Sequence, residues 1–162
     1  MAGSVRRHPF LTALAALAFL GFGASLVAFV VVPSFVKSTL VEDLPAGPRG
    51  SGSPAIETVR QGELVRISAA DYGSGVVRIV QIGLDRFLRF ENVDIAGAPD
   101  MYVYLSDQVD GRTGTFIDLG KLKATNGSFN YAIEAQVDLT KVRSVVVWCK
   151  QFTVTITYGV LN

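Results

Sequence analysis

The feature that most constrains the fold is a hydrophobic period of two, which begins at Gly62 and continues to the end of the chain. Apolar and polar residues alternate there in short stretches rich in β-branched and aromatic side chains. Glycine, proline and aspartate separate the stretches, as turns require. The pattern predicts an all-β sandwich of about eight short antiparallel strands. The expected strands are 62–68, 76–82, 86–92, 101–106, 143–149 and 152–158, with a hairpin at Asn126-Gly127 flanked by two more.

A second feature is the apolar run of residues 10–32, FLTALAALAFLGFGASLVAFVVV, which contains no charged residue. As a helix rising about 1.5 Å per residue it is about 34 Å long, enough to cross a hydrocarbon core of about 30 Å. The run continues past its small residues, so we expect an uncleaved anchor rather than a signal peptide. Arg6 and Arg7 precede it, which predicts a cytoplasmic N-terminus. Gly21 and Ser25 form a small-residue pair of the kind that lets a second helix approach, and they are candidate partner contacts.

Residues 42–54, EDLPAGPRGSGSP, mark a change in composition. Proline, glycine and serine in this density suit a linker without a packed core. We therefore expect a cytoplasmic tail (1–9), a transmembrane helix (10–32), a linker (33–59) and a β domain (60–162). The protein would cross the cytoplasmic (inner) membrane once and display the domain in the periplasm or outside the cell, an oxidising setting.

Composition excludes several classes of function. Residues 56–162 carry 11 Lys/Arg and 12 Asp/Glu, so the domain lacks the basic stripe that a nucleic-acid groove needs. The one histidine, His8, precedes the domain, which excludes Ser-His and Cys-His nucleophile pairs and the usual zinc sites within it. One cysteine, Cys149, cannot form an intramolecular disulfide. We expect a domain that is not an enzyme, has no catalytic residue, and holds no metal or cofactor.

Several segments of the domain resemble, in the same order, the DM-thirteen domain, also called the electron-transfer DM domain. They are GELV with SGVVRI (62–65 and 74–79), LRFENVDIAGAPDMYVYLS (88–106), LGKLKATNGSFNYAI (119–133) and SVVVWCKQFTVTITYGVL (144–161). The Trp148-Cys149 dipeptide followed by Phe152 is the most specific element. The resemblance implies an all-β fold related to DOMON sandwiches and a redox role for the cysteine that corresponds to Cys149. The chain departs from the family pattern at Val93, at Ala98 and at Asp71, where many members carry a histidine.

Cys149 has two interpretations, and the sequence leaves both open. A reactive thiol needs access and a nearby cation, and Lys150 is its neighbour in the chain. Neighbours in a strand point to opposite faces, however, and a free cysteine is among the most buried residue types. A single thiol also cannot cycle as a dithiol, so it would need a partner thiol or a sulfenic acid intermediate. Cys149 and the adjacent Trp148 are the redox candidates, and a packed cysteine beside Trp148 is the competing interpretation.

The last expected strand bears on that choice. Strict alternation predicts one buried apolar face and one exposed threonine face, and it puts Cys149 on the threonine face. A bulge at Lys150-Gln151 would reverse the assignment. The two predicted faces are Phe152, Val154, Ile156 and Tyr158, and Thr153, Thr155 and Thr157.

Two further groups of residues, a pair of tyrosines and four aspartates, can be interpreted either as structural or as functional. Tyr102 and Tyr104 share one face of their strand, which makes them candidate contacts for a partner, although a sandwich core explains most aromatic residues of the domain. Four aspartates near turns carry carboxylate oxygens, which calcium prefers as ligands. Their spacing fits no EF-hand loop, and aspartate commonly hydrogen-bonds to its own backbone in turns. They are Asp94, Asp100, Asp107 and Asp110.

These observations predict a non-enzymatic accessory or interaction subunit of a membrane complex, for example an electron-transfer complex. Its partners would be the lipid bilayer, through residues 10–32, and a membrane protein. The alternative is a redox module that uses the thiol of Cys149 for electron transfer or thiol chemistry.

Overall fold

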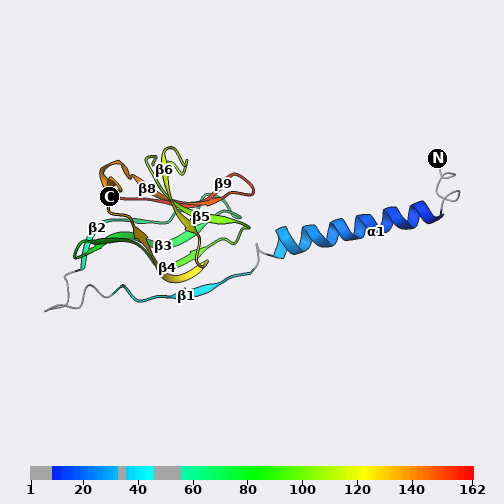
Figure 1. Ribbon diagram of the computed structural model, residues 1–162, viewed down its shortest axis with the longest axis horizontal. Coiled ribbons are helices and arrows are strands. Elements are labelled where there is room, and N and C mark those ends of the chain that lie inside the picture. The colour runs from blue at the N-terminus through cyan, green and yellow to red at the C-terminus, as the bar shows by residue number, and fades with distance from the viewer. Residues whose placement is uncertain (1–8, 33–35, 46–55) are drawn as a thin grey trace.

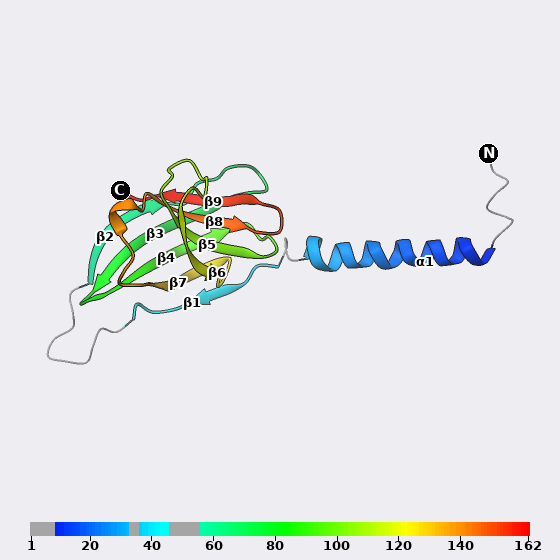
Figure 2. The ribbon, with the colours of Figure 1, turned by 45° about the horizontal axis from the view of Figure 1, so that its top comes forward.

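The computed structural model describes residues 9–32, 36–45 and 56–162 of the chain. Two β-sheets pack face to face, and the strand order is β1-β7-β4-β3-β2 in one and β6-β5-β8-β9 in the other (Figures 1 and 2). This confirms the predicted all-β sandwich, with nine strands among the described residues. The strands are β1 (Thr39–Val41), β2 (Ile56–Glu63), β3 (Gly73–Ile82), β4 (Asp85–Ile95), β5 (Met101–Ser106), β6 (Phe116–Lys121), β7 (Asn126–Ile133), β8 (Ser144–Cys149) and β9 (Val154–Val160), and a short 3₁₀ helix, η2 (Leu139–Lys141), precedes β8.

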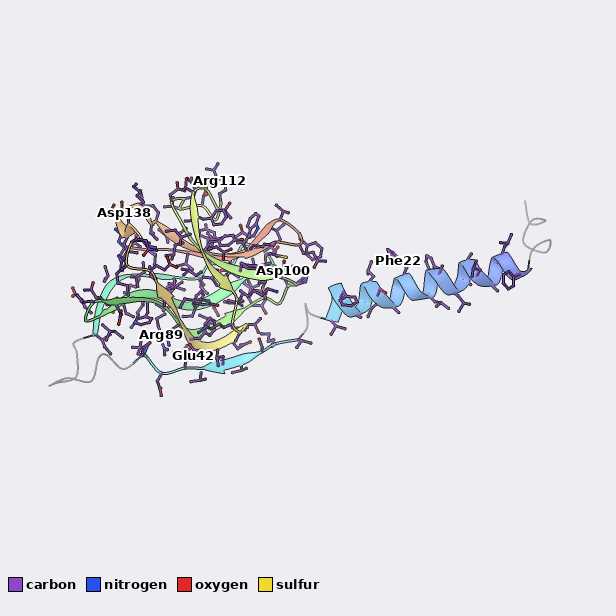
Figure 3. The ribbon with its side chains drawn as sticks, viewed as in Figure 1. Phe22, Glu42, Arg89, Asp100, Arg112 and Asp138 are labelled. Atoms are coloured by element: carbon purple, nitrogen blue, oxygen red, sulfur yellow. The ribbon has the colours of Figure 1, made fainter. Side chains whose placement is uncertain are left out.

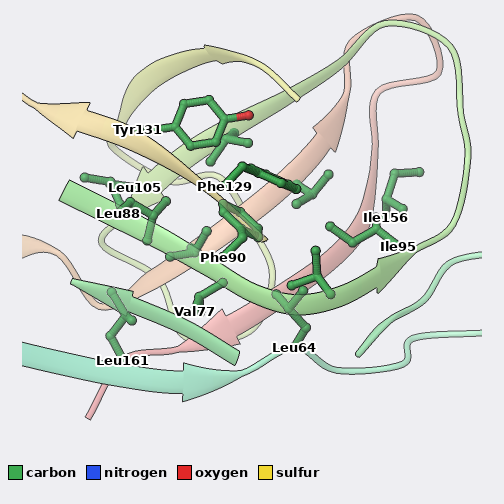
Figure 4. Packing of buried hydrophobic residues seen from close by; sticks show 14 of the residues in the cluster. Leu64, Val77, Leu88, Phe90, Ile95, Leu105, Phe129, Tyr131, Ile156 and Leu161 are labelled. Atoms are coloured by element: carbon green, nitrogen blue, oxygen red, sulfur yellow. The ribbon is translucent and has the colours of Figure 1, made fainter. Parts of the chain in front are cut away.

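The core lies between the inner faces of the two sheets. Phe90 of β4 and Phe129 of β7 stack with ring centroids 5.0 Å apart, and Tyr131 meets Phe90 edge to face at 5.9 Å (Figure 4). Strands β5 and β8 add alternate aliphatic residues from the opposite sheet, including Leu105 and Val147. The period-two pattern therefore places its apolar residues where the sequence predicts, because alternate side chains of a strand share a face.

The N-terminal apolar run is helical. Helix α1 (Pro9–Leu26) continues into a π-helical turn, η1 (Val27–Val31). The segment Phe10–Phe29 is long and apolar enough to cross a membrane, and every residue in it is exposed. A signal sequence near an N-terminus passes the same test of length and composition, so the helix is either a membrane anchor or a signal sequence. The predicted cytoplasmic tail, with Arg6 and Arg7, lies outside the described residues apart from Pro9.

The predicted linker, 33–59, is only partly a linker. Residues 39–41 form β1, which runs parallel to β7 with Leu40 opposite Gly127, and β2 already begins at Ile56. Gly127 makes this possible, because a Cβ at this position would collide with the carbonyl oxygen of Leu40. Residues 33–35 and 46–55 of the predicted linker lie outside the described residues.

A carboxylate secures the chain directly after β1. Glu42 Oε2 accepts a hydrogen bond from the backbone N–H of Asn130 at 2.8 Å, and Glu42 Oε1 lies 3.0 Å from the ammonium of Lys123. The carbonyl of Glu42 accepts a bond from the Arg89 guanidinium at 2.6 Å, and Figure 3 shows these two residues close together. Residues 38–43, which we call the strap, therefore belong to the sandwich. Their composition is that of a linker, so the sequence did not predict this.

Two local predictions are wrong. The predicted strand 62–68 ends at Glu63, because the chain then crosses to the other sheet, where the N–H of Val65 donates to the carbonyl of Tyr158 at 2.9 Å. Asn126-Gly127 is not a hairpin, since β6 and β7 belong to different sheets. Gly127 instead has a positive φ of 108° and provides the space that β1 occupies.

The faces of β9 also differ from strict alternation. The pairing of β8 with β9 shifts between Val147 and Trp148, so that Val147 lies opposite Thr157 and Trp148 opposite Thr155. Ile156 is the extra residue, and the bulge lies within β9 rather than at Lys150-Gln151. Thr157 is consequently buried, and its hydroxyl donates to the carbonyl of Val65 at 2.8 Å.

The expected apolar face of β9 is therefore divided. Ile156 is buried in the core, whereas Phe152 and Val154 are exposed by 47% and 40%. Of the expected threonine face, Thr153 is exposed, while Thr155 is half-buried and donates to the carbonyl of Gly111 at 2.6 Å.

Candidate functional site

Cys149 lies on the inner face of the four-stranded sheet and is 0% exposed. Its thiol donates a hydrogen bond to the carbonyl oxygen of Pro99, with 2.9 Å between sulfur and oxygen. In the sheet it lies opposite Met101 of β5 and Val154 of β9, and it belongs to the same core cluster as Val147. The sulfur is therefore packed in the core, and the thiol hydrogen is engaged in the hydrogen bond to Pro99.

Trp148 points to the other face of the same strand. It lies opposite Tyr102 of β5, and it lines a groove together with Val65, Arg112 and Tyr158. The loop between β5 and β6 forms one wall of this groove (Arg112 is labelled in Figure 3). The two redox candidates are neighbours in sequence, but the sheet separates the indole from the thiol.

Tyr102 is the centre of a cluster on the outer face. The ammonium of Lys150 lies 3.3 Å from the centroid of its ring, and that of Lys121 lies 5.8 Å from it. Lys150 pairs with Asp118 at 3.2 Å, and Lys121 pairs with Asp100 at 3.4 Å. We call these five residues, contributed by β5, β6 and the turns next to β5 and β8, the tyrosine–lysine face.

The surroundings of Lys150 within this face stabilise its charged form. Burial works to lower the pKa of Lys150, but the hydrogen bond and the negative charge of Asp118 outweigh it, and the pKa is raised. An ammonium held over an aromatic ring gains a further attraction from the ring quadrupole. The face therefore holds two lysines and two aspartates in ion pairs around one tyrosine ring. Of these residue types, tyrosine is the one that is enriched in protein interfaces.

Tyr104 does not share the exposure predicted for it. Only 2% of the residue is exposed, because its ring stacks on Phe116 with 4.2 Å between centroids. Burial raises the pKa of the Tyr104 phenol, and the positive charge of Lys150 partly opposes this shift. The ammonium of Lys150 lies 5.9 Å from the centroid of the Tyr104 ring. Of the two predicted contact residues, Tyr102 is the more exposed, and its contact with a partner stays a prediction.

Comparison with known families decides the family of this sandwich. A family model described as electron transfer DM13 matches residues 66–161, more than half of the chain. The chain belongs to the electron transfer DM13 family. No curated protein and no solved structure matches the chain.

The DM13 match includes both Cys149 and the tyrosine–lysine face, and it leaves out α1, β1 and β2. The electron-transfer description therefore attaches to the sandwich rather than to the apolar helix. The sandwich nevertheless needs strands from outside the match, because Gln61 of β2 exchanges backbone hydrogen bonds with Asn162, of 3.1 and 2.9 Å. These bonds join the edges of the two sheets.

The acidic residues of the DM13 domain act within turns and ion pairs. Asp107 accepts hydrogen bonds from the side-chain amide of Gln108 at 2.8 Å and from the N–H of Thr115 at 3.0 Å, and these bonds lower its pKa. Asp110 pairs with Arg112 at 2.7 Å. Asp94 pairs with Lys37 at 2.7 Å. Among the described residues, no group of three or more histidine, cysteine or carboxylate side chains is placed to hold a metal ion.

The small residues Gly21 and Ser25 both lie in α1. Ser25 Oγ donates to the carbonyl of Gly21 at 2.9 Å, within the helix itself. A Cβ added at Gly21 would have no neighbour within 4 Å. The surface at Gly21 is open to a second helix, and such a contact remains a prediction.

Sequence reasoning missed Lys150, Lys121 and Asp118 as members of the site. Lys121 ends β6, Lys150 follows β8, and Asp118 lies within β6. Charged residues are common at such exposed positions and carry no functional signal by themselves. Their meeting over one ring depends on the register of β5 against β6 and β8. The sequence signal that could have found the lysines is a lysine at a strand end next to an outward-facing tyrosine. Using it requires the register of β5 against β6 and β8.

Proposed function

We propose that this chain is a membrane-anchored, non-enzymatic accessory domain of an electron-transfer complex. Helix α1 holds the DM13 sandwich at the membrane, and the tyrosine–lysine face contacts a membrane-protein partner. The family match supports the electron-transfer context, and the length and composition of Phe10–Phe29 support the anchor. In this function the redox centre belongs to the partner, and the sandwich positions or protects it.

One contrast carries the proposal. The thiol of Cys149 is sealed in the core, whereas the ammonium of Lys150 and its Asp118 partner keep 39% and 38% of their side chains exposed. A group that exchanges electrons through thiol chemistry must be reached by another sulfur or by an oxidant. A docking surface must instead be exposed and preorganised, and the tyrosine–lysine face meets both requirements.

The proposed topology follows from the charges beside the helix. Arg6 and Arg7 favour a cytoplasmic N-terminus, which puts the sandwich in the periplasm or outside the cell. The chain would cross the cytoplasmic membrane once. A protease added outside spheroplasts should then digest the sandwich and leave a short membrane-protected fragment, whereas the opposite orientation would protect the sandwich.

The experiment that tests the function reverses one charge in the docking face. Lys150→Glu places a second anion beside Asp118, so we expect it to abolish co-purification of the partner after mild-detergent extraction. Arg78→Glu is the matched control, because it reverses one half-exposed charge paired with Glu91 at 3.2 Å, on the other sheet. Mass spectrometry and a visible spectrum identify what co-purifies.

The outcomes separate the two functions. A coloured complex that survives Arg78→Glu and is lost with Lys150→Glu supports the accessory subunit. A solitary, colourless protein in both the wild type and the variants contradicts it. If Cys149→Ser abolishes electron transfer while the complex stays intact and folded, the redox module that uses this thiol is the better function.

A further inference from the structure

The connection between the apolar helix and the sandwich is very short. The N–H of Val36 donates to the carbonyl of Val32, at the end of the helical segment, at 3.1 Å. The N–H of Ser38 already donates to the hydroxyl of Thr125 in the sandwich at 2.9 Å. Two residues span at most about 7 Å, so the helix and the sandwich are joined by a link of about that length.

The link itself is also fastened to the sandwich. Lys37 pairs with Asp94 at 2.7 Å, and its ammonium lies 5.9 Å from the centroid of the Tyr72 ring. The predicted linker of 27 residues, 33–59, would let the sandwich diffuse far from the membrane. The contacts of Lys37 and Ser38 instead hold the sandwich close to the end of the helix. Figure 1 shows α1 leaving from the end of the sandwich at which β1 begins.

Exposed apolar side chains gather at this same end. Phe152 and Val154 are 47% and 40% exposed, and Ile67 and Val65 are 48% and 40% exposed. Phe152 and Val154 line one hollow together with Lys37, and Val154 lines the adjoining groove with Val65 and Ile67. We call these four apolar residues the apolar end, and Lys37 connects it directly to the helix.

Basic and aromatic residues accompany the apolar end. The guanidinium of Arg66 lies 4.6 Å from the centroid of the Tyr72 ring, and Lys37 lies on the same ring. Aromatic rings with adjacent lysine or arginine are enriched where a protein meets lipid headgroups, because the ring is amphipathic and the cation meets phosphate. The composition of this end therefore matches a bilayer surface.

We propose that the apolar end rests in the headgroup layer of the bilayer that α1 enters, an inference that depends on the proposed anchoring by α1. If the hydrocarbon core ends at Phe29, the helical rise to Val32, the hydrogen bond between Val36 and Val32 and the two-residue link place Ser38 within about 17 Å of it. The headgroup layer occupies about 5–8 Å of that distance. A hairpin tip carrying Phe152 and a loop carrying Ile67 bridge the remainder.

This placement gives the tyrosine–lysine face an orientation. Lys150 begins the hairpin that carries Phe152, and its N–H donates to the carbonyl of Asp100 at 3.1 Å. Asp100 lies at the end of the sandwich nearer α1, and Asp138 at the other (Figure 3). The docking face would then stand directly above the membrane plane, where the extramembrane surface of a membrane protein lies.

The test places a fluorescent probe at each end of the sandwich in the full-length chain. Phe152→Trp adds an indole at the apolar end. Leu84→Trp is the matched control, because Leu84 is 94% exposed in the turn between β3 and β4, at the opposite end. Each variant is reconstituted into phosphatidylcholine and phosphatidylglycerol vesicles with and without a headgroup spin-labelled lipid, and the emission of Trp148 in the wild type is subtracted.

The expected result is loss of most of the added emission in Phe152→Trp and little loss in Leu84→Trp. Equal quenching of the two probes would overturn the inference. Flotation of the vesicles distinguishes this outcome from failure of the anchor. Protein that floats with lipid but shows equal quenching contradicts only the headgroup contact, whereas protein that does not float contradicts the proposed membrane anchoring itself. Both substituted positions are exposed, so neither variant should disturb folding.

Discussion

Replacing Cys149 with alanine should lower the stability of the sandwich in proportion to the packing it removes. The side chain is 0% exposed, and its sulfur lies 2.9 Å from the Pro99 carbonyl. Losing a buried group of methylene size costs about 0.8 kcal/mol. A remaining void of about 25 Å³ adds about 0.6 kcal/mol, and the lost hydrogen bond adds about 0.5 kcal/mol. We therefore expect Cys149→Ala to lower the free energy of unfolding by about 2 kcal/mol.

The midpoint of thermal unfolding is the practical measurement. For a domain of about 100 residues, a change of about 2 kcal/mol corresponds to a decrease of about 8–16 °C. Cys149→Ser is the matched variant, because its hydroxyl can still donate to Pro99, so we expect a smaller decrease. Near-ultraviolet circular dichroism and the emission of Trp148 both report the transition. In the wild type, a thiol reagent should label Cys149 only as the sandwich unfolds.

Two results would refute this reasoning. Rapid, stoichiometric labelling of the folded wild type would show that the thiol is accessible. An unchanged melting temperature in Cys149→Ala, together with complete loss of electron transfer, would show that the sulfur acts chemically rather than by packing.

Three further predictions concern the strap and the core. The N–H of Asn130 and the ammonium of Lys123 lower the pKa of Glu42 below 4.5, against the opposing effect of burial. The stability that ionised Glu42 contributes is therefore fully present above pH 4.5, and it is lost as the pH falls through the pKa of Glu42 in the folded protein. Amide exchange in β1 should rise in that acid range, and Glu42→Gln should remove the pH dependence. Gly127→Ala should detach β1, seen as lost amide protection there, because its Cβ meets the Leu40 carbonyl; unchanged protection would contradict this. Tyr131→Phe should cost about 1–3 kcal/mol in urea unfolding, because the hydroxyl bonds two backbone groups at 2.8 and 3.0 Å; an unchanged midpoint would contradict that role.

The class of fold was predictable because strand periodicity is a local property. Alternation in β5 and β8 follows from adjacent residues alone, so the central strands and most of the core residues lie where expected. The apolar helix was predictable for a related reason, since a continuous uncharged run leaves few alternatives. The Trp148-Cys149 dipeptide and its neighbours were also enough to suggest the family.

Features that depend on pairing between distant segments were not predictable. The bulge at Ile156 reverses the faces of β9, and nothing in the local sequence distinguishes it from a bulge at Lys150-Gln151 or from no bulge at all. The strap at residues 38–43 has the composition of a linker, and its place in the sandwich depends on a missing Cβ at Gly127, more than 80 residues later.

By itself, the sequence determined the all-β class and the apolar helix, because each depends on composition or on near neighbours. Only the tertiary structure decided that Cys149 is sealed in the core while Lys150, one residue later, lies over Tyr102. The physical reason is the register of β5 against β6 and β8. A strand can offer its side chains to either face, and only its neighbours in the sheet decide which of them meet.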